Sequence, residues 1–307
     1  MMRIVVHGQQ AFGKAVLEAL LKRKENVVAV FCAPENPGQK ADPLKEAALA
    51  AGLPVHQPKS YRRPEVWEQF RSLKPDLCLM AYVTLFVPEE VLNAPTHGTI
   101  QYHPSLLPKH RGPSSINWPI IWGAKETGVT IFWPDNGLDT GPVLLQKKVP
   151  IRDADTLGSL YFEKLFPMGV EAMLEGLDLV QAGKAAKTKQ DDTQATYEGW
   201  CKPEHAEVQW GRPVHEVWNL IRGTTPQPGA WCRINGKVVQ LSEAALLPAA
   251  APRAPGQICA IGEKSFTVSA LGGQIEVLRV RPEGGSKVSA SEYARSAGLK
   301  VGTVLGQ

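Results

Sequence analysis

The stretch Thr99-Ile-Gln-Tyr-His-Pro-Ser-Leu-Leu-Pro-Lys-His-Arg-Gly112 begins like a strand and continues as a proline-punctuated loop. Side chains alternate along an extended strand, so Gln101 and His103 share one face and Tyr102 points to the other. Pro104 disfavours helical geometry at His103, which keeps that residue extended. Polar groups at the carboxyl end of a strand are typical of binding sites in open α/β sheets.

Short apolar runs alternate with amphipathic stretches through the first half of the chain, which is typical of a parallel α/β sheet. The strands that we expect are Ile4–Val6, Val27–Cys32, Leu53–His56, Asp76–Ala81, Thr99–His103 and Val129–Trp133. The expected helices are Ala11–Lys22, Pro43–Ala51, Val66–Leu73, Ser114–Trp122 and a long one over Asp155–Gln181, kinked at Pro167. The sequence therefore predicts a Rossmann-like, mostly parallel sheet.

The character of the chain changes after a polar segment, Gly183–Thr196, which we interpret as a linker. Beyond it lie a helix and short strand-like runs separated by Gly, Pro and Asn-Gly turns, as in a small OB-like β-barrel. They are Val214–Ile221, Val238–Leu241, Gly256–Ala260, Ser265–Ala270 and Ile275–Val280, and the Pro/Ala-rich stretch Leu247–Pro255 is expected to be a loop. We predict a catalytic domain over residues 1–183, a linker over 184–206 and a β-barrel domain over 207–307.

Composition describes an ordinary folded chain of 307 residues with 43% hydrophobic residues and a formal net charge of +4. The mild charge suits anionic small molecules and gives no argument for nucleic acid. Five scattered cysteines without a C-x-x-C pair predict reduced thiols, with no disulfide framework and no metal site. Because we find no secretion signal and no run of eighteen apolar residues, we expect a cytoplasmic protein with no membrane partner.

A second glycine-punctuated loop, Asp135-Asn-Gly-Leu-Asp-Thr-Gly141, follows an expected strand and carries two carboxylates. An imidazole (His103), a carboxamide (Gln101) and a carboxylate (Asp139) together can stabilise an oxyanion and orient a nucleophile. Taken singly, the histidine could be structural and the aspartate a turn-former. The segment Lys109-His-Arg-Gly112 predicts a cationic patch beside them.

The turn Gly8-Gln-Gln-Ala-Phe-Gly13 follows the first expected strand and could present a helix N-terminus to an anion. It lacks the G-x-G-x-x-G spacing of a dinucleotide site, so we favour the interpretation as a tight turn.

The two loops, with His103 and Asp139 separated by 36 residues, closely resemble the formyltransferase family. That family includes glycinamide ribonucleotide, methionyl-tRNA and aminosugar formyltransferases and the N-terminal hydrolase domain of 10-formyltetrahydrofolate dehydrogenase. Segments resembling the hydrolase domain extend over nearly the whole chain: Lys40-Ala-Asp-Pro-Leu44, Phe132-Trp133, Leu165-Phe-Pro167, Ala195-Thr-Tyr-Glu-Gly199, Ile221-Arg-Gly223 and Pro228-Gly-Ala-Trp231.

The resemblance implies that 10-formyltetrahydrofolate is the formyl donor and that no metal takes part. It implies His103 and Asp139 as the catalytic pair, and we add Gln101 because of its place on the strand. It further implies that the segments Ala81–Phe86 and Asp135–Gly141 line the pterin pocket and that Ser105–Pro108 shapes the site. The cofactor-binding residues expected on this basis are Ala81, Tyr82, Val83, Leu85, Phe86, Ser105, Asp135, Gly137, Leu138 and Gly141.

The acceptor stays open at this stage, as does the choice between transfer and hydrolysis. Transferases of the family carry Asn where this chain has Gln101, which keeps a carboxamide but moves it one methylene outward. We favour a small amine or water as acceptor. The segment Pro34–Leu44 is short, and Lys40 is its only cation. The cations of the C-terminal domain alternate with apolar strand positions. Both observations disfavour tRNA as the acceptor, because tRNA binding needs several phosphate contacts. A folate-binding protein without catalysis is the third hypothesis, and intact His103 and Asp139 argue against it.

Overall fold

The computed structural model describes residues 1–248 and 253–306, which form two compact units. The first unit comprises Met1–Ser115, Thr127–Val149 and Phe162–Tyr197, and the second comprises Ile116–Glu126, Pro150–Tyr161 and Glu198–Gln307. The chain therefore passes between the units several times before it stays in the second.

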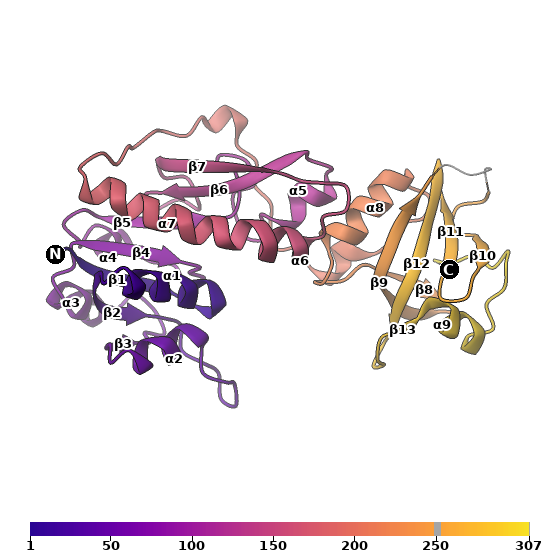
Figure 1. Ribbon diagram of the computed structural model, residues 1–307, viewed down its shortest axis with the longest axis horizontal. Coiled ribbons are helices and arrows are strands. Elements are labelled where there is room, and N and C mark those ends of the chain that lie inside the picture. The colour runs from indigo at the N-terminus through magenta and orange to yellow at the C-terminus, as the bar shows by residue number, and fades with distance from the viewer. Residues whose placement is uncertain (249–252, 307) are drawn as a thin grey trace. The chain divides into compact units, whose positions relative to one another are not determined.

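A seven-stranded sheet organises the first unit, with strand order β3-β2-β1-β4-β5-β6-β7 (Figure 1). Its strands are β1 (Arg3–Gly8), β2 (Asn26–Phe31), β3 (Val55–His56), β4 (Leu77–Ala81), β5 (Thr99–His103), β6 (Glu126–Phe132) and β7 (Val143–Pro150). Neighbours from β3 to β5 pair in parallel, whereas β5 and β6 pair antiparallel. The strand order reverses direction between β1 and β4, which is where sheets of this kind place ligands.

Helices cover both faces of this sheet. On one face, α3 (Pro64–Ser72) and α4 (Glu89–Leu92) pack against side chains of β1, β2 and β4, and the ring centroids of Phe31 and Phe70 lie 5.1 Å apart. The other face carries α1 (Gln10–Lys22), where Phe12 stacks on Tyr102 of β5 with ring centroids 4.1 Å apart. The short helix α2 (Pro43–Ala50) lies against α1. Because Tyr102 points to the α1 face, Gln101 and His103 face the other way.

The long helix expected over Asp155–Gln181 is divided. A capped turn, α6 (Leu157–Ser159), leads into a π-helical segment over Leu160–Leu165, and α7 (Phe166–Gln181) follows with Pro167 in its first turn. A proline fits there because the first helical N–H groups need no partner within the helix. Within α7, a Cβ at Gly169 would lie 2.5 Å from the Tyr102 ring, so only glycine lets the helix approach β5 this closely.

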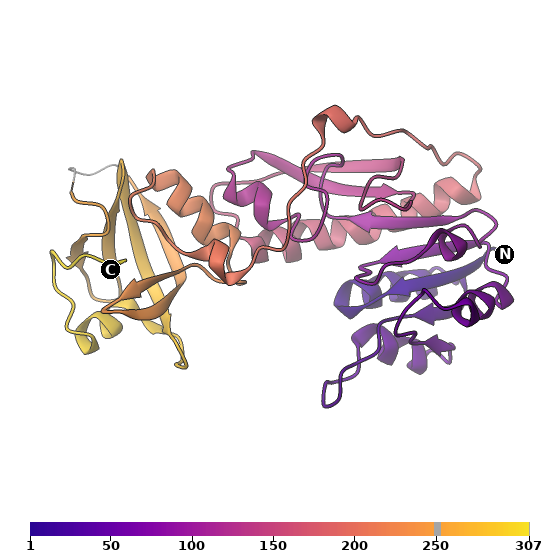
Figure 2. The same cartoon turned by 180° about the vertical axis from the view of Figure 1, so that it is seen from behind.

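A six-stranded antiparallel sheet, curled into a half-barrel, forms most of the second unit (Figure 2). Five strands run in the order β10-β11-β12-β9-β8, and β13 pairs with β12. They are β8 (Trp231–Ile234), β9 (Lys237–Leu247), β10 (Ile258–Ile261), β11 (Phe266–Ala270), β12 (Gly273–Pro282) and β13 (Val288–Ser289). The unit's helices are α5 (Asn117–Ile121), the short α6, α8 (Val214–Gly223), α9 (Ala290–Ser296) and a 3-10 turn over Pro203–Ala206. Apolar residues of these strands and helices form one continuous core.

Helix α8 carries the polar contacts that hold the second unit's early segments in place. Arg222 is buried, and its guanidinium donates to the carbonyl oxygens of Arg152 and Asp155 at 3.1 and 3.2 Å. Asn117 of α5 donates to the carbonyl oxygen of Gly223 at 2.9 Å. These bonds explain why Ile116–Glu126 and Pro150–Tyr161 belong to this unit.

The predicted fold class is confirmed, with a mostly parallel Rossmann-like sheet and a second, smaller antiparallel β unit. The sequence interpretation missed β7, β8 and α9, whose apolar positions are interrupted by charged residues. Part of the loop predicted over Leu247–Pro255, residues 249–252, lies outside the described residues.

Cys32, Cys78 and Cys232 are buried free thiols, and burial raises the pKa of each. Within residues 1–248 and 253–306, no helix is long and apolar enough to span a bilayer.

Candidate active site

His103 ends β5 and is buried, with 5% of its surface exposed. Its Nε2 atom lies 2.8 Å from the carbonyl oxygen of His110. Because a carbonyl oxygen only accepts hydrogen bonds, the proton of this bond must sit on Nε2. The ring is thereby oriented by the loop that follows it, and Nδ1 is the nitrogen left for chemistry.

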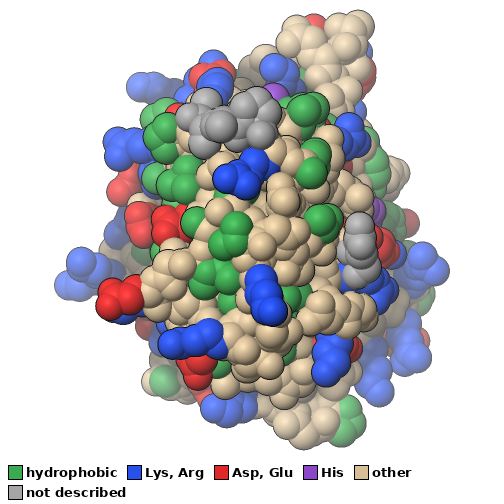
Figure 3. Space-filling view, turned by 90° about the vertical axis from the view of Figure 1, so that its right-hand side faces the viewer, with side chains coloured by type: hydrophobic (Ala, Val, Ile, Leu, Met, Phe, Trp, Pro, Cys, Tyr) green, Lys and Arg blue, Asp and Glu red, His purple; other side chains and the backbone are tan. Residues whose placement is uncertain are grey.

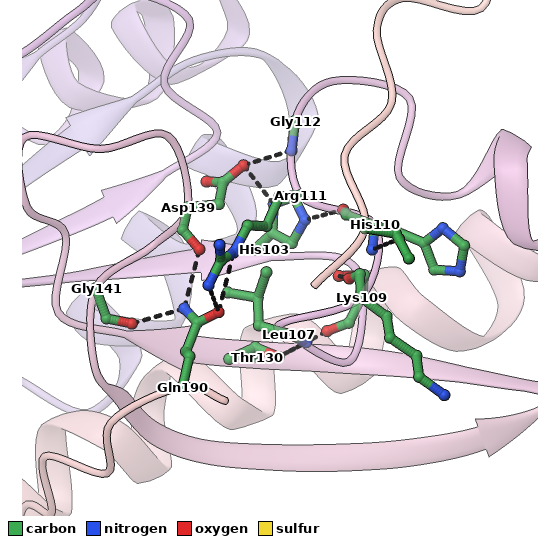
Figure 4. Close-up of polar contacts among 12 residues, drawn as sticks. His103, Leu107, Lys109, His110, Arg111, Gly112, Thr130, Asp139, Gly141 and Gln190 are labelled. Atoms are coloured by element: carbon green, nitrogen blue, oxygen red, sulfur yellow. Dashed lines mark hydrogen bonds and ion pairs between the residues drawn. The ribbon is translucent and has the colours of Figure 1, made fainter. Parts of the chain in front are cut away.

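Asp139 supplies the carboxylate that faces this nitrogen (Figure 4). Its Oδ2 lies 3.6 Å from His103 Nδ1 and accepts a hydrogen bond of 2.8 Å from the backbone N–H of Gly112. The side chain is 6% exposed, and the backbone at this residue is left-handed, with φ of 57°. Nothing in the described part of the chain donates a hydrogen bond to Oδ1, so one carboxylate oxygen remains available to a substrate.

The direction of β6 decides the route by which Asp139 reaches His103. The sequence predicts two strand ends and leaves their relative direction open, and β6 runs antiparallel to β5 and ends at Phe132, which pairs with Gln101. The loop after β6 therefore starts beside the middle of β5, and it brings Asp139 back to the level of His103. Antiparallel pairing cannot be distinguished from parallel pairing by the apolar pattern of one strand.

The loop Asp135–Gly141 is stabilised by its own contacts. Asp135 Oδ1 accepts from the N–H of Gly137 at 3.0 Å and from the hydroxyl of Thr140 at 2.6 Å. A Cβ at Gly141 would lie 1.8 Å from the carbonyl oxygen of Trp133, so the loop excludes any other residue there. These contacts explain why an aspartate stands at position 135 and a glycine at position 141, and the explanation does not depend on a bound pterin.

Gln190 and Arg111 hold this loop, and sequence reasoning missed both. The Gln190 Nε2 atom donates to the carbonyl oxygens of Asp139 and Gly141 at 2.9 and 2.7 Å. Its Oε1 accepts from Arg111 at 2.8 Å, and Arg111 also pairs with Asp192 at 2.6 Å. Gln190 is 6% exposed and Arg111 8% exposed, so the predicted cationic patch is wrong at Arg111, whose charge is buried and paired.

The segment Gly183–Thr196, interpreted as a linker, is thus fixed along the site. Besides Gln190, Thr196 accepts a hydrogen bond from the N–H of His110 through its hydroxyl at 2.8 Å, and its carbonyl oxygen accepts from the N–H of Arg111 at 3.0 Å. A polar, unpatterned sequence gives no periodic signal when its side chains bind loops instead of packing in a core, so the sequence could not reveal these contacts.

The loop after His103 is held from inside. Ser105 is fully buried, and its hydroxyl donates to the carbonyl oxygen of Lys109 at 2.7 Å. The Thr130 hydroxyl donates to the Ser105 carbonyl oxygen at 2.6 Å and accepts from the N–H of Leu107 at 3.1 Å. Ser105 therefore shapes the loop through its own contacts with the chain.

The residues expected around the pterin divide into two groups. Ala81 is buried, and Val83 and Leu85 pack against the core on the α3 side of the sheet. Three large apolar side chains are instead exposed: Tyr82 at 44%, Phe86 at 56% and Leu138 at 52%. Exposed apolar groups on loops at a sheet edge are typical of ligand-binding surfaces.

Gln101 is half-buried on the His103 face of β5, paired with Met80 on one side and Phe132 on the other. Its carboxamide makes no hydrogen bond within residues 1–248 and 253–306, in contrast to His103 and Asp139. In the same described residues, no group of three or more His, Cys, Asp or Glu side chains is arranged to hold a metal ion.

Comparison of the sequence with models of known protein families shows to which family the chain belongs. Residues 2–175 match the model of the formyl transferase domain, and residues 201–298 match that of the formyl transferase C-terminal domain. The chain belongs to the formyl transferase family. The resemblance inferred from the sequence is thereby confirmed. Relatives in this family transfer or hydrolyse formyl groups, and 10-formyltetrahydrofolate is their donor.

Two relatives illustrate the range of the family. The mitochondrial 10-formyltetrahydrofolate dehydrogenase of Mus musculus is 40% identical over 95% of this chain, but the chain spans only 33% of that relative's length. The methionyl-tRNA formyltransferase of Trichlorobacter lovleyi is 38% identical over 99% of this chain and 96% of its own length. Sequence similarity therefore supports both branches of the family.

The fold has solved counterparts. HypX from Aquifex aeolicus, in complex with tetrahydrofolic acid, superposes with a TM-score of 0.70 at 20% identity and covers 98% of this chain and 48% of its own. At 20% identity this similarity establishes only the fold that the two chains share.

Proposed function

We propose that this protein removes the formyl group from 10-formyltetrahydrofolate and passes it to water or a small amine, releasing tetrahydrofolate. The observation that carries the proposal is the buried pair of His103 and Asp139, with Nδ1 and Oδ2 separated by 3.6 Å. Each side chain is oriented by a backbone group of the loop over Lys109–Gly112, which leaves one imidazole nitrogen and one carboxylate oxygen for a substrate.

These two groups match the needs of formyl transfer. The nucleophile attacks the formyl carbon, and Asp139 orients it and accepts its proton. The resulting tetrahedral oxyanion needs a donor, which protonated Nδ1 of His103 provides. When the bond from carbon to N10 of the folate breaks, N10 takes the proton that Asp139 accepted, and tetrahydrofolate leaves. Neighbouring Gln101, with an unused carboxamide on the same strand face, is a second donor for the formyl oxygen.

The pterin ring has a suitable surface in the same unit. Tyr82, Phe86 and Leu138 expose apolar side chains on the two segments expected to line the pocket. A flat aromatic ring that covers them would remove apolar area from water, and backbone groups of the loops would bind its polar edge. We therefore assign the pterin to the segments Ala81–Phe86 and Asp135–Gly141.

Formylation of initiator methionyl-tRNA is the second candidate, favoured by the relative from Trichlorobacter lovleyi that shares the full chain length. Binding of tRNA depends on several phosphate contacts. On the face of the second unit in Figure 3, Lys and Arg side chains are spread among apolar, neutral and acidic groups. Among the cations of the second unit, Arg279 lies 3.7 Å from Glu243, and Arg233 lies over the ring of Trp231. We therefore rank this candidate below the first.

One experiment separates the candidates. Pure protein is incubated with 10-formyltetrahydrofolate, and tetrahydrofolate is measured without an acceptor, with small amines, and with initiator methionyl-tRNA. Turnover without acceptor supports hydrolysis, turnover that needs an amine supports transfer, and turnover only with tRNA supports the second candidate. Absence of tetrahydrofolate in all three would contradict both, and bound but unchanged folate would favour a binding protein.

A further inference from the structure

The amino end of α1 lies at the carboxyl edge of β1, where sheets of this class commonly bind a phosphate. In this chain the position already holds an anion of its own. Both carboxylate oxygens of Asp42 lie 2.9 Å from the backbone nitrogen of Gln10, the first residue of α1. The same carboxylate accepts a hydrogen bond of 2.8 Å from the N–H of Leu44 and so caps α2.

Asp42 is fixed in this place. It is 8% exposed, and its backbone N–H donates to Glu35 Oε1 at 3.1 Å. The other oxygen of Glu35 accepts from Gln57 and Lys45 at 2.9 and 3.0 Å. The hydrogen bond from Gln57 is the main cause that lowers the pKa of Glu35 to about 2, so the Glu35 carboxylate is ionised at neutral pH. Gln10 itself has a left-handed backbone, with φ of 60°, which the bond to Asp42 helps to hold.

A cavity of about 460 Å³ opens beside this arrangement. Gln9 and Gln10 line one part of it, and three carboxylates and one ammonium group line another part: Glu35, Asp42, Glu46 and Lys40. Gln9 links the cavity to the expected pterin segment, because its N–H donates to the carbonyl oxygen of Ala81 and its carboxamide to the Thr84 hydroxyl, both at 3.3 Å. Through Gln9, the cavity therefore neighbours the segment Ala81–Phe86, which is expected to line the pterin pocket.

We propose that Asp42 is a specificity-determining residue: it fills the anion position of α1 and makes this side of the site reject acceptors that carry a phosphate. The inference rests on the proposed function and deepens it, because it restricts the acceptor to water or an amine without a phosphate group. A phosphate approaching Gln10 meets a buried carboxylate that already uses the N–H group and repels a second anion. The rest of the cavity lining, with its acidic excess, adds to that repulsion.

The test uses binding, which does not depend on turnover. Inorganic pyrophosphate is titrated calorimetrically into the wild type, Asp42→Ser and the control Glu46→Gln. Serine still caps α2 but removes the charge and frees the Gln10 N–H, whereas Glu46→Gln removes one charge from the same cavity and frees nothing. We expect no measurable binding to the wild type or to the control, and affinity at least about tenfold higher in Asp42→Ser.

Pyrophosphate binding to the wild type at this cavity, or equal gains in Asp42→Ser and Glu46→Gln, would overturn the inference. Circular dichroism checks that Asp42→Ser is folded, and Asp42→Asn serves if it is not, since asparagine keeps the cap without the charge. A second test needs only the wild type. Release of tetrahydrofolate from 10-formyltetrahydrofolate is measured in the presence of ethanolamine and, separately, of O-phosphoethanolamine. We expect no inhibition by the phosphorylated compound, and inhibition by it alone would contradict the proposal. Release of tetrahydrofolate in the same assay tests the proposed function separately.

Discussion

Two positions along one sheet differ in how completely the polar atoms of their buried side chains are hydrogen-bonded. At β5, the His103 ring and the Asp139 carboxylate are each held by one backbone hydrogen bond and each retain an unused polar atom. At β1 and β2, both oxygens of Asp42 are used by backbone N–H groups, and the anion position is closed. The difference teaches that burial alone does not mark a reactive group. A group that is positioned but incompletely satisfied can take up a substrate, whereas a fully satisfied one determines what is excluded.

The largest effect should follow from removing a reactive group at β5. Asp139→Asn and His103→Ala should each reduce turnover by roughly a hundredfold or more, since each loses a group that acts on the transition state. Folate affinity should stay within a few-fold, because apolar side chains and backbone groups bind the pterin. Rates of tetrahydrofolate release and equilibrium folate binding measure the two effects.

Matched controls remove the same groups elsewhere. His97→Ala changes an exposed histidine just before β5, and Asp153→Asn changes a carboxylate whose side chain is 91% exposed. Both should keep near-normal turnover. Turnover of Asp139→Asn or His103→Ala within a few-fold of wild type would show that the incompletely satisfied groups at β5 do not act in the reaction.

A smaller effect is expected at Gln101, whose carboxamide has no partner in the described residues. Gln101→Leu should slow formyl release by roughly tenfold to a hundredfold, because one neutral donor to the formyl oxygen stabilises a transition state by about 1–3 kcal/mol. Single-turnover rates with and without acceptor provide the measurement. An unchanged rate would show that Gln101 points aside, and water oriented by Asp139 would then become the better acceptor.

Gln190 tests whether the position of Asp139 depends on its support. Gln190→Leu removes the donor to the Asp139 and Gly141 carbonyl oxygens, and we expect kcat to fall about tenfold with a smaller change in KM for the folate. Gln190→Glu still accepts from Arg111 but cannot donate, so it should lower kcat similarly while preserving thermal stability better. Gln194→Leu, at an exposed site four residues on, is the control. A loss of stability in Gln190→Leu without any loss of kcat in the folded fraction would assign Gln190 a structural role only.

The smallest effect concerns a buried histidine that lies outside the chemistry. His7 is 3% exposed, its Nε2 lies 2.9 Å from the Tyr61 hydroxyl, and burial lowers its pKa to about 3. The unfolded chain takes up a proton below about pH 6.5. The folded chain does not, so His7 contributes stability that is present above pH 6.5 and is lost as the pH falls toward 3.

Urea unfolding at about pH 7.5 and pH 5.5 measures this contribution. The free energy of unfolding of the wild type should fall by about 1 kcal/mol more over this range than that of His7→Phe. Tyr61→Phe removes the same hydrogen bond but keeps the titrating group, so it should follow the wild type. Equal slopes for the wild type and His7→Phe would contradict the buried neutral histidine.

The sequence alone determined the fold class, the family and the candidate residues around His103 and Asp139. Local signals sufficed for these, because apolar runs, turn residues and two dense motifs each depend on neighbours along the chain. The predicted loop glycines also have a local reason, as the contact of Gly141 with the Trp133 carbonyl shows.

Only the tertiary structure decided how these residues are held together. The reversal of β6, the hydrogen bonds of Gln190 to the Asp139 loop and the burial of Arg111 all join segments distant in sequence. The contact of Asp42 with Gln10 spans 32 residues and leaves no trace in the periodicity of either segment. Such contacts depend on where the sheet brings loops into register, and a hydrogen bond between two loops has no repeating pattern by which a single sequence could reveal it.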